Sequence, residues 1–222
     1  MTDPKINAAI KAALQAFTNY GSFDATSLNN QIDRVFASDE DFMAKVGLLD
    51  SVFDENPQLE ELREVFFDLL MINFFSADVK KLEDDYLETP EWEEIEEQTL
   101  DRGTELLNLL LYLNECEDED IEPELEDYLK EFLLVDEDEF QDEYRIYEPV
   151  IAHQVLMESP AAEINKVAQK LPDDSELKEL FYPMMCFFQN VDDTAGAKNT
   201  IADNAVNKQF DMAVFCILEQ FN

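Results

Sequence analysis

The sequence has little of the chemistry on which most enzyme active sites depend. His153 is the only histidine, and its apolar neighbours favour a packed or surface position over a catalytic one. A catalytic triad, a histidine-rich zinc site and a di-iron bundle built from Glu-x-x-His motifs are therefore not expected. The four glycines are isolated at positions 21, 47, 103 and 196, so no glycine-rich phosphate loop exists. The sequence indicates no cofactor.

Cysteines and long apolar runs are also scarce. The chain has three widely spaced cysteines, Cys116, Cys186 and Cys216. Their spacing fits neither a zinc site nor a disulfide framework and favours buried, inert thiols. The densest apolar run, Val65 to Phe75, is interrupted by Asp68 and Asn73 and is too short to cross a membrane. The N-terminal segment lacks the apolar stretch of a signal peptide, so we expect a cytoplasmic protein with no membrane partner.

Basic residues are few compared with acidic ones. Lysine and arginine total 15 and aspartate and glutamate 53, for a net charge of -38. Between Ser51 and Glu158 there are 36 acidic and 6 basic residues. Such a surface repels nucleic acid and anionic membranes and attracts cations and basic proteins. The charge is equally consistent with a role in solubility alone. A halophilic origin is a third explanation, although lysine outnumbers arginine and large apolar residues are plentiful.

Helix-start signals and apolar stripes recur along the chain. Hydrophobic residues make up 46% of it, which distinguishes it from acidic disordered tails. Asp3 and Pro4 form an N-cap and a first-turn proline, and Gly21 is well placed to end that helix. The apolar residues between them recur at helical spacing: Ile6, Ile10, Leu14 and Phe17. The pattern predicts an all-α protein, a bundle or helical array of about eight to ten helices in a single domain, 1–222.

Local signals predict several boundaries in more detail. Ser38 is a possible cap for the helix that carries Phe42. The segment after Pro57 becomes apolar nearly all round, which predicts a helix at the centre of the bundle. Thr89 and Pro90 start a long helix that is expected to end in the leucine-rich stretch 106–113. Pro183 falls inside an apolar pattern and is expected to kink or divide its helix.

The two halves of the chain share a pattern at an offset of 115 positions. Residues 57–67 align without gaps with residues 172–182, and the first apolar stripe aligns with Ile121, Leu125, Leu129 and Phe132. Helical periodicity alone produces such matches, but one offset serves several helices. An internal duplication, with similar halves 1–107 and 116–222, is therefore a hypothesis.

One pattern has enzymatic meaning. Residues 93–97 read Glu-Glu-x-x-Glu and residues 115–118 read Glu-x-x-Asp, as in all-α nucleoside triphosphate pyrophosphohydrolases. Carboxylates three and four positions apart share a helix face and can hold magnesium beside a triphosphate. A segment this acidic generates such matches by chance. No basic cluster lies nearby to bind the triphosphate, and the second motif falls in a charged run that is typical of a loop.

Two acidic clusters flank the helix expected from Pro123 to Leu134. They contain the candidate partner-binding residues Asp118, Glu119, Asp120, Asp136, Glu137, Asp138 and Glu139. Exposed aromatic side chains among the carboxylates would favour a binding surface. The candidates for that role are Trp92, Tyr112, Tyr128, Tyr144 and Tyr147.

The sequence favours a non-enzymatic acidic protein that engages a basic protein partner. An inhibitor, an immunity-type protein and an adaptor all fit this description, without direct contact to nucleic acid. The alternative is the magnesium-dependent pyrophosphohydrolase, which requires the two carboxylate motifs to converge across a cleft.

Overall fold

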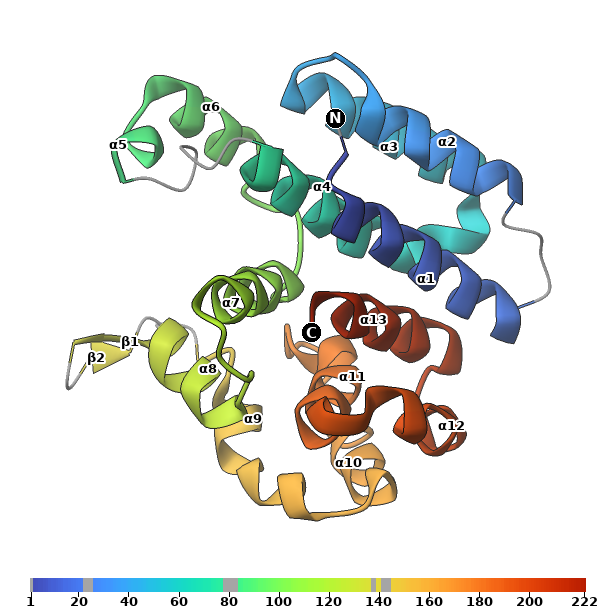
Figure 1. The fold of residues 1–222 in the computed structure, drawn as a ribbon, viewed down its shortest axis with the longest axis vertical. Helices are drawn as coiled ribbons and strands as arrows, with labels where there is room; N and C mark the ends of the chain where they lie inside the picture. The colour runs from blue at the N-terminus through green and yellow to red at the C-terminus, as the bar shows by residue number, and fades with distance from the viewer. Residues whose placement is uncertain (1, 22–25, 78–83, 137–138, 141–144) are drawn as a thin grey trace.

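A computed structural model describes residues 2–21, 26–77, 84–136, 139–140 and 145–222 (Figure 1). Within these residues the chain forms thirteen α-helices: α1 Pro4–Tyr20, α2 Thr26–Ala37, α3 Phe42–Glu55, α4 Arg63–Ala77, α5 Asp84–Leu87, α6 Pro90–Thr99, α7 Leu106–Glu119, α8 Leu125–Leu133, α9 Glu148–Ala152, α10 Ala161–Ala168, α11 Lys178–Gln189, α12 Thr194–Asn204 and α13 Lys208–Phe221. Three 3-10 helices join them: η1 Pro57–Leu62, η3 Gln154–Glu158 and η4 Val191–Asp193. The all-α class is confirmed.

The described β structure is limited to one short antiparallel pair, β1 Leu134–Asp136 with β2 Glu139–Phe140. The helix count exceeds the predicted eight to ten for two reasons. The segment expected to form one long helix from Thr89 is divided into α6 and α7, and the described part of the chain includes two very short helices, α5 and α9. Pro183 lies inside α11 and does not divide it.

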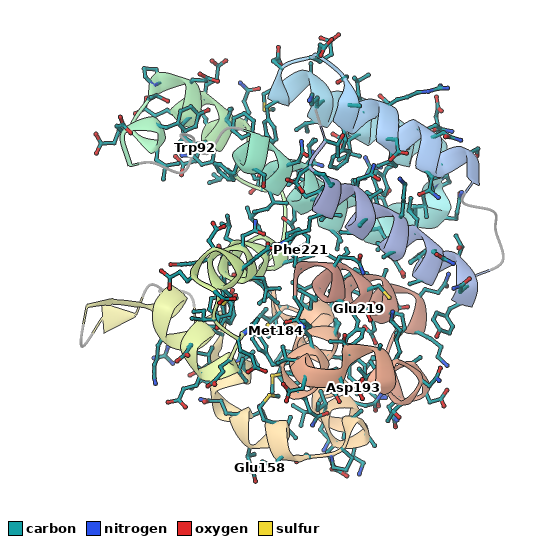
Figure 2. The ribbon with its side chains drawn as sticks, viewed as in Figure 1. Trp92, Glu158, Met184, Asp193, Glu219 and Phe221 are labelled. Atoms are coloured by element: carbon teal, nitrogen blue, oxygen red, sulfur yellow. The ribbon has the colours of Figure 1, made fainter. Side chains whose placement is uncertain are left out.

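The first and the last of these helices pack against each other at the centre of the molecule. Figure 1 shows α1 beside α13, with α2 to α6 on one side and α7 to α12 on the other. The buried face of α1 contains the predicted stripe of Ile6, Ile10, Leu14 and Phe17. Phe221 lies where α13 approaches α7 and α1 (Figure 2), and the Lys5 ammonium lies 5.1 Å from the centre of its ring. The buried side chains form one continuous hydrophobic cluster.

Helix α4 occupies the central position that its all-round apolar sequence predicts. It packs against α1, α3 and α7, and Phe66, Leu69 and Leu70 are almost completely buried. Helix α11 is the equally buried helix of the other half, from Leu180 to Phe188. A helix that is apolar on all faces is stable in water only when other elements surround it.

Several helix ends follow local capping rules. The Asp3 carboxylate accepts a hydrogen bond from the Lys5 backbone, and the Thr89 hydroxyl accepts one from Trp92, so both predicted N-caps are confirmed. Gly21 ends α1 as predicted. Ser38 does not cap α3, because its hydroxyl donates to the Val35 carbonyl at the end of α2. The α3 N-cap is Asp41, whose carboxylate accepts from the Ala44 backbone.

The break between α6 and α7 depends on contacts with α4. Gly103 has a φ of 83°, a conformation that favours glycine. A Cβ atom at this position would lie 2.6 Å from Asp68 Oδ1. The Thr104 backbone and hydroxyl both donate to Asp68, at 3.0 and 2.5 Å, and the Gly103 N–H donates to Glu64 at 2.7 Å. These bonds hold the chain in a turn where a continuous helix was predicted.

Arg102 connects the same turn to α3 and α4 through ion pairs. Its guanidinium binds Glu64 and Asp50 at 3.0 Å each, and it lies 4.8 Å from the centre of the Phe67 ring. Asp50 also pairs with Arg63. Asp68 itself is completely buried, and this burial raises its pKa well above the ordinary value despite the bonds from Thr104. The two arginines therefore compensate the half-buried carboxylates of Asp50 and Glu64, whereas Asp68 is bound by Thr104.

The structure does not show an internal duplication. The starts of α4 and α11, Arg63 and Lys178, do lie 115 positions apart. However, η1 at Pro57–Leu62 has no helical counterpart at 172–177, and α10 is much shorter than α3. The repeat therefore stays a hypothesis. No helix in the described ranges is long and apolar enough to cross a membrane.

Candidate functional site

The predicted acidic clusters have different surroundings. Asp118 and Glu119 are exposed in the last turn of α7, and Asp120 follows as its C-cap. The expected loop at 115–118 is therefore wrong, because α7 continues through it with Leu113 and Cys116 buried. Of the second cluster, only the backbone of Asp136 and Glu139 is described, as a register pair between β1 and β2. Glu137 and Asp138 lie outside the described residues.

The carboxylates at the end of α7 stand in an unfavourable electrostatic position. The C-terminal end of a helix carries partial negative charge, so acidic side chains there repel it. Glu117 binds Lys5. In the part of the chain that the structure describes, Asp118, Glu119 and Asp120 form no ion pair. The first predicted cluster is therefore an uncompensated acidic patch.

Asp120 adds a conformational cost to this electrostatic one. Its φ of 57° places a non-glycine residue in the left-handed region. We expect Asp120→Gly to raise the free energy of unfolding by about 1 kcal/mol, because glycine removes both costs. Urea unfolding measures this change. Asp118→Gly is the matched control: it removes the same charge from a helical position and should destabilise the protein. If both variants lose stability equally, the left-handed cap costs nothing.

The two carboxylate motifs occupy separate helices. Glu93, Glu94 and Glu97 lie on α6, and Glu115 and Asp118 lie on α7. Among the described residues, no three His, Cys, Asp or Glu side chains are close enough together to hold a metal ion. The structure thus does not bring these motifs together.

Three of the aromatic residues expected at the surface are buried. Tyr112, Tyr128 and Tyr147 are each less than 5% exposed. Their hydroxyls bond inside the protein: Tyr128 to Tyr147 at 2.7 Å, and Tyr147 to Glu105 at 2.6 Å. The Tyr112 hydroxyl donates to the Glu124 carbonyl. Tyrosine can enter a core when its hydroxyl finds such a partner, which spacing alone does not reveal.

The other reactive side chains, the histidine and the cysteines, are packed within the protein. His153 Nδ1 is 2.7 Å from the Pro149 carbonyl, and its ring packs edge-on against Phe181. The three cysteines are free and buried, as expected, and burial raises their pKa values. Of the other aromatic candidates, Trp92 is half-buried and Tyr144 lies outside the described residues.

A groove that sequence reasoning missed lies between α3 and α6, above α4. Its volume is about 490 Å³, and we call it the α3–α6 groove. Figure 1 shows α5 and α6 projecting from the end of α4 at the edge of the molecule. Helix α6 is held against α4 by Ile95, which is 5% exposed, and by Trp92, whose ring centre lies 5.4 Å from that of Phe75. Figure 2 shows Trp92 on this projecting end.

One wall of the α3–α6 groove is a single face of α6. Because Ile95 and Trp92 face α4, the exposed side chains of Glu91, Glu94 and Gln98 line the groove at helical spacing. These three positions extend about 10 Å along α6. Glu94 accepts a hydrogen bond from the Gln98 amide at 3.2 Å.

The opposite wall is the beginning of α3 together with the two residues that precede it. These residues contribute the exposed carboxylates of Glu40 and Asp41, and α3 contributes the half-buried Met43 and Lys45. The Lys45 ammonium donates to the Phe36 carbonyl at 3.3 Å. Within the described ranges, neither Glu40 nor Glu94 has a cationic partner, whereas Asp50 on α3 and Glu64 on α4 are paired with Arg102. Acidic side chains therefore border the groove on both sides.

The floor of the groove is apolar except for the buried Asn73. Phe42, Leu70 and Ile95 form it and are themselves almost buried. Phe74 is half-buried, and its ring centre lies 4.8 Å from that of Phe42. Apolar surface between two carboxylate walls suits a ligand that is apolar in the middle and cationic at its sides.

Comparisons with known proteins give no information about the family or function of this chain. The chain matches no protein-family model, no curated protein and no solved structure.

Proposed function

We propose that this protein is a non-enzymatic binding protein that engages a basic partner protein, as an inhibitor, an immunity-type protein or an adaptor. The observation that supports the proposal is the α3–α6 groove, with acidic residues on both walls and an apolar floor. A cationic partner would compensate Glu40 and Glu94, which have no cationic partner in the described part of the chain. Apolar side chains of the partner would pack on the floor of the groove, and this burial of apolar surface would add binding energy that charge alone does not provide.

The net charge of the whole chain supports the same proposal. A net charge of -38 generates a long-range field that attracts a basic protein and speeds its association. The uncompensated patch at the end of α7, Asp118 to Asp120, strengthens that field. We therefore assign the specific contact to the groove and keep the predicted clusters as a second, steering surface. We also propose that the protein acts in the cytoplasm, where buried free cysteines stay reduced.

Affinity capture from a lysate of the native cells tests this proposal. We expect wild-type protein to retain basic proteins at low salt and to release them at high salt. The quadruple variant Glu40→Gln, Asp41→Asn, Glu91→Gln and Glu94→Gln should retain them about tenfold less. Asparagine at position 41 keeps an acceptor for the Ala44 N–H, so the α3 cap is preserved.

An equal change of charge elsewhere provides the control. The variant Asp118→Asn, Glu119→Gln, Asp136→Asn and Glu137→Gln removes four charges from the predicted clusters. It should slow association and flatten its salt dependence but leave the retained proteins bound. Loss of retention in this variant alone would move the specific contact to the clusters. Retention of no basic protein by wild type would contradict the proposal, as would magnesium-dependent nucleotide hydrolysis that disappears in Glu94→Gln.

The internal duplication is a separate proposal about origin. The shared offset of Arg63 and Lys178 supports it, and the differing segments at 57–62 and 172–177 weigh against it. If the halves share an ancestor, superposition of 1–107 on 116–222 should place α4 and α11 among equivalent neighbours.

A further inference from the structure

We propose that the α3–α6 groove receives an amphipathic α-helix of the partner, with an apolar stripe flanked on both sides by lysine or arginine. This inference rests on the proposed function and names the recognised element. It requires a ligand with two cationic edges, because carboxylates stand on both walls: Glu40 and Asp41 on one, Glu91 and Glu94 on the other. Met43 and Phe74, both half-buried, offer the apolar contact between them.

The groove favours a helix over an extended segment because of backbone hydrogen bonding. Apart from Glu40 and Asp41, which precede α3, its walls and floor are built from helices, whose interior N–H and C=O groups already bond within each helix. An extended segment would find no sheet edge here with which to form backbone hydrogen bonds. Its own N–H and C=O groups would lose their hydrogen bonds to water and gain none in return. A helix carries its backbone bonds internally and presents only side chains. This is the geometry of helix-in-groove recognition.

The length of the acidic wall sets the length of the recognised segment. Glu91, Glu94 and Gln98 occupy one face of α6 over about 10 Å, which corresponds to about two turns of a bound helix. Two or three apolar side chains at helical spacing fill such a length. Gln98 is the neutral member of this wall, and its amide donates a hydrogen bond to Glu94. Replacing Gln98 with a charged residue therefore changes the charge of the groove beside Glu94.

Fluorescence anisotropy with defined peptides tests the inference on the full-length protein. The probe is a labelled peptide of about 14 residues made of leucine, alanine and lysine, with a leucine stripe and lysines on both flanks. A scrambled peptide of the same composition and a version with a central proline keep the charge and lose the helical stripe. We expect the amphipathic peptide to bind about tenfold tighter than either, and salt to weaken its binding.

A pair of substitutions at Gln98 locates the site. Gln98→Lys should weaken binding of the amphipathic peptide about tenfold, because the lysine pairs with Glu94 and repels the peptide. Gln98→Glu should strengthen it. Gln169→Lys and Gln169→Glu make the same changes at an exposed position after α10 and should alter the affinity less than about twofold. Gln98 and Gln169 are both exposed, so we expect all four variants to fold, and circular dichroism verifies this.

The outcomes separate this inference from the proposed function. Equal binding of the scrambled and amphipathic peptides would overturn helix recognition and leave a basic partner in place. Equal effects at Gln98 and Gln169, or no binding of the amphipathic peptide, would overturn the groove as its site. The peptide experiments could succeed at the groove while the lysate yields no basic protein. That result would support the inference and contradict the proposed function.

Discussion

Gly103→Ala should destabilise the protein by about 2–4 kcal/mol. Alanine disfavours a φ of 83°, at a cost of about 1–2 kcal/mol. Its Cβ would also lie 2.6 Å from Asp68 Oδ1, a buried atom that accepts the Thr104 N–H. Relief of that contact requires the turn to move, which weakens bonds to a buried carboxyl group. Urea unfolding followed by circular dichroism measures the loss.

Gly47→Ala is the matched control for this prediction. Gly47 lies on an exposed face of α3, and no atom beyond its chain neighbours and the nearby α3 backbone lies within 4 Å of the position that its Cβ would occupy. Alanine in a helix interior should therefore stabilise the protein by about 0.5–1 kcal/mol. Opposite signs at the two glycines would support the account of the α6–α7 turn. A neutral Gly103→Ala would mean that the turn does not need this conformation.

Asp211 should make stability depend on pH. It is 2% exposed at the start of α13, and burial raises its pKa from the ordinary 3.8 to about 7. The Val206 and Asn207 N–H groups donate to Oδ2 at 2.7 and 3.0 Å, which opposes the shift without cancelling it. The folded state therefore prefers the protonated acid. This contribution is present below pH 4 and is lost as the pH rises to about 7.

The expected size of this effect is large. A shift from 3.8 to about 7 corresponds to a stability loss on the order of 4 kcal/mol across that pH range. Asp211→Asn keeps an oxygen acceptor for both N–H groups and carries no charge, so it should be more stable than wild type at pH 8 and should show a flatter pH profile. Unfolding at a series of pH values measures both. Exposed Asp174→Asn is the control and should follow wild type. Parallel profiles for Asp211→Asn and wild type would show that Asp211 is not protonated in the fold.

Local capping signals predict much of this fold. The local sequence correctly predicts helix caps at Asp3, Thr89 and Gly21, because a cap involves only neighbouring residues. The turn at Gly103 could not be predicted in this way. Its geometry is set by Asp68 and Glu64, which lie more than thirty residues earlier, and an isolated glycine inside a helical pattern does not reveal such partners.

The candidate site was harder to predict than the fold. Charge counting locates acidic clusters but does not show which carboxylates stand opposite one another. Glu40 and Glu94 are far apart in the sequence and line the same groove only because α3 and α6 both border α4. The tyrosines illustrate the same limit, since the partner that allows Tyr147 to be buried is Glu105, 42 positions away.

The contact between α1 and α13 has a consequence for biosynthesis. A ribosome completes α1 about two hundred residues before it completes α13, the helix against which α1 packs. During that interval the nascent chain cannot complete the packing of α1, so this packing step follows the emergence of α13 from the exit tunnel. The abundant negative charge between the two helices keeps the waiting chain hydrated and discourages contacts with neighbouring nascent chains.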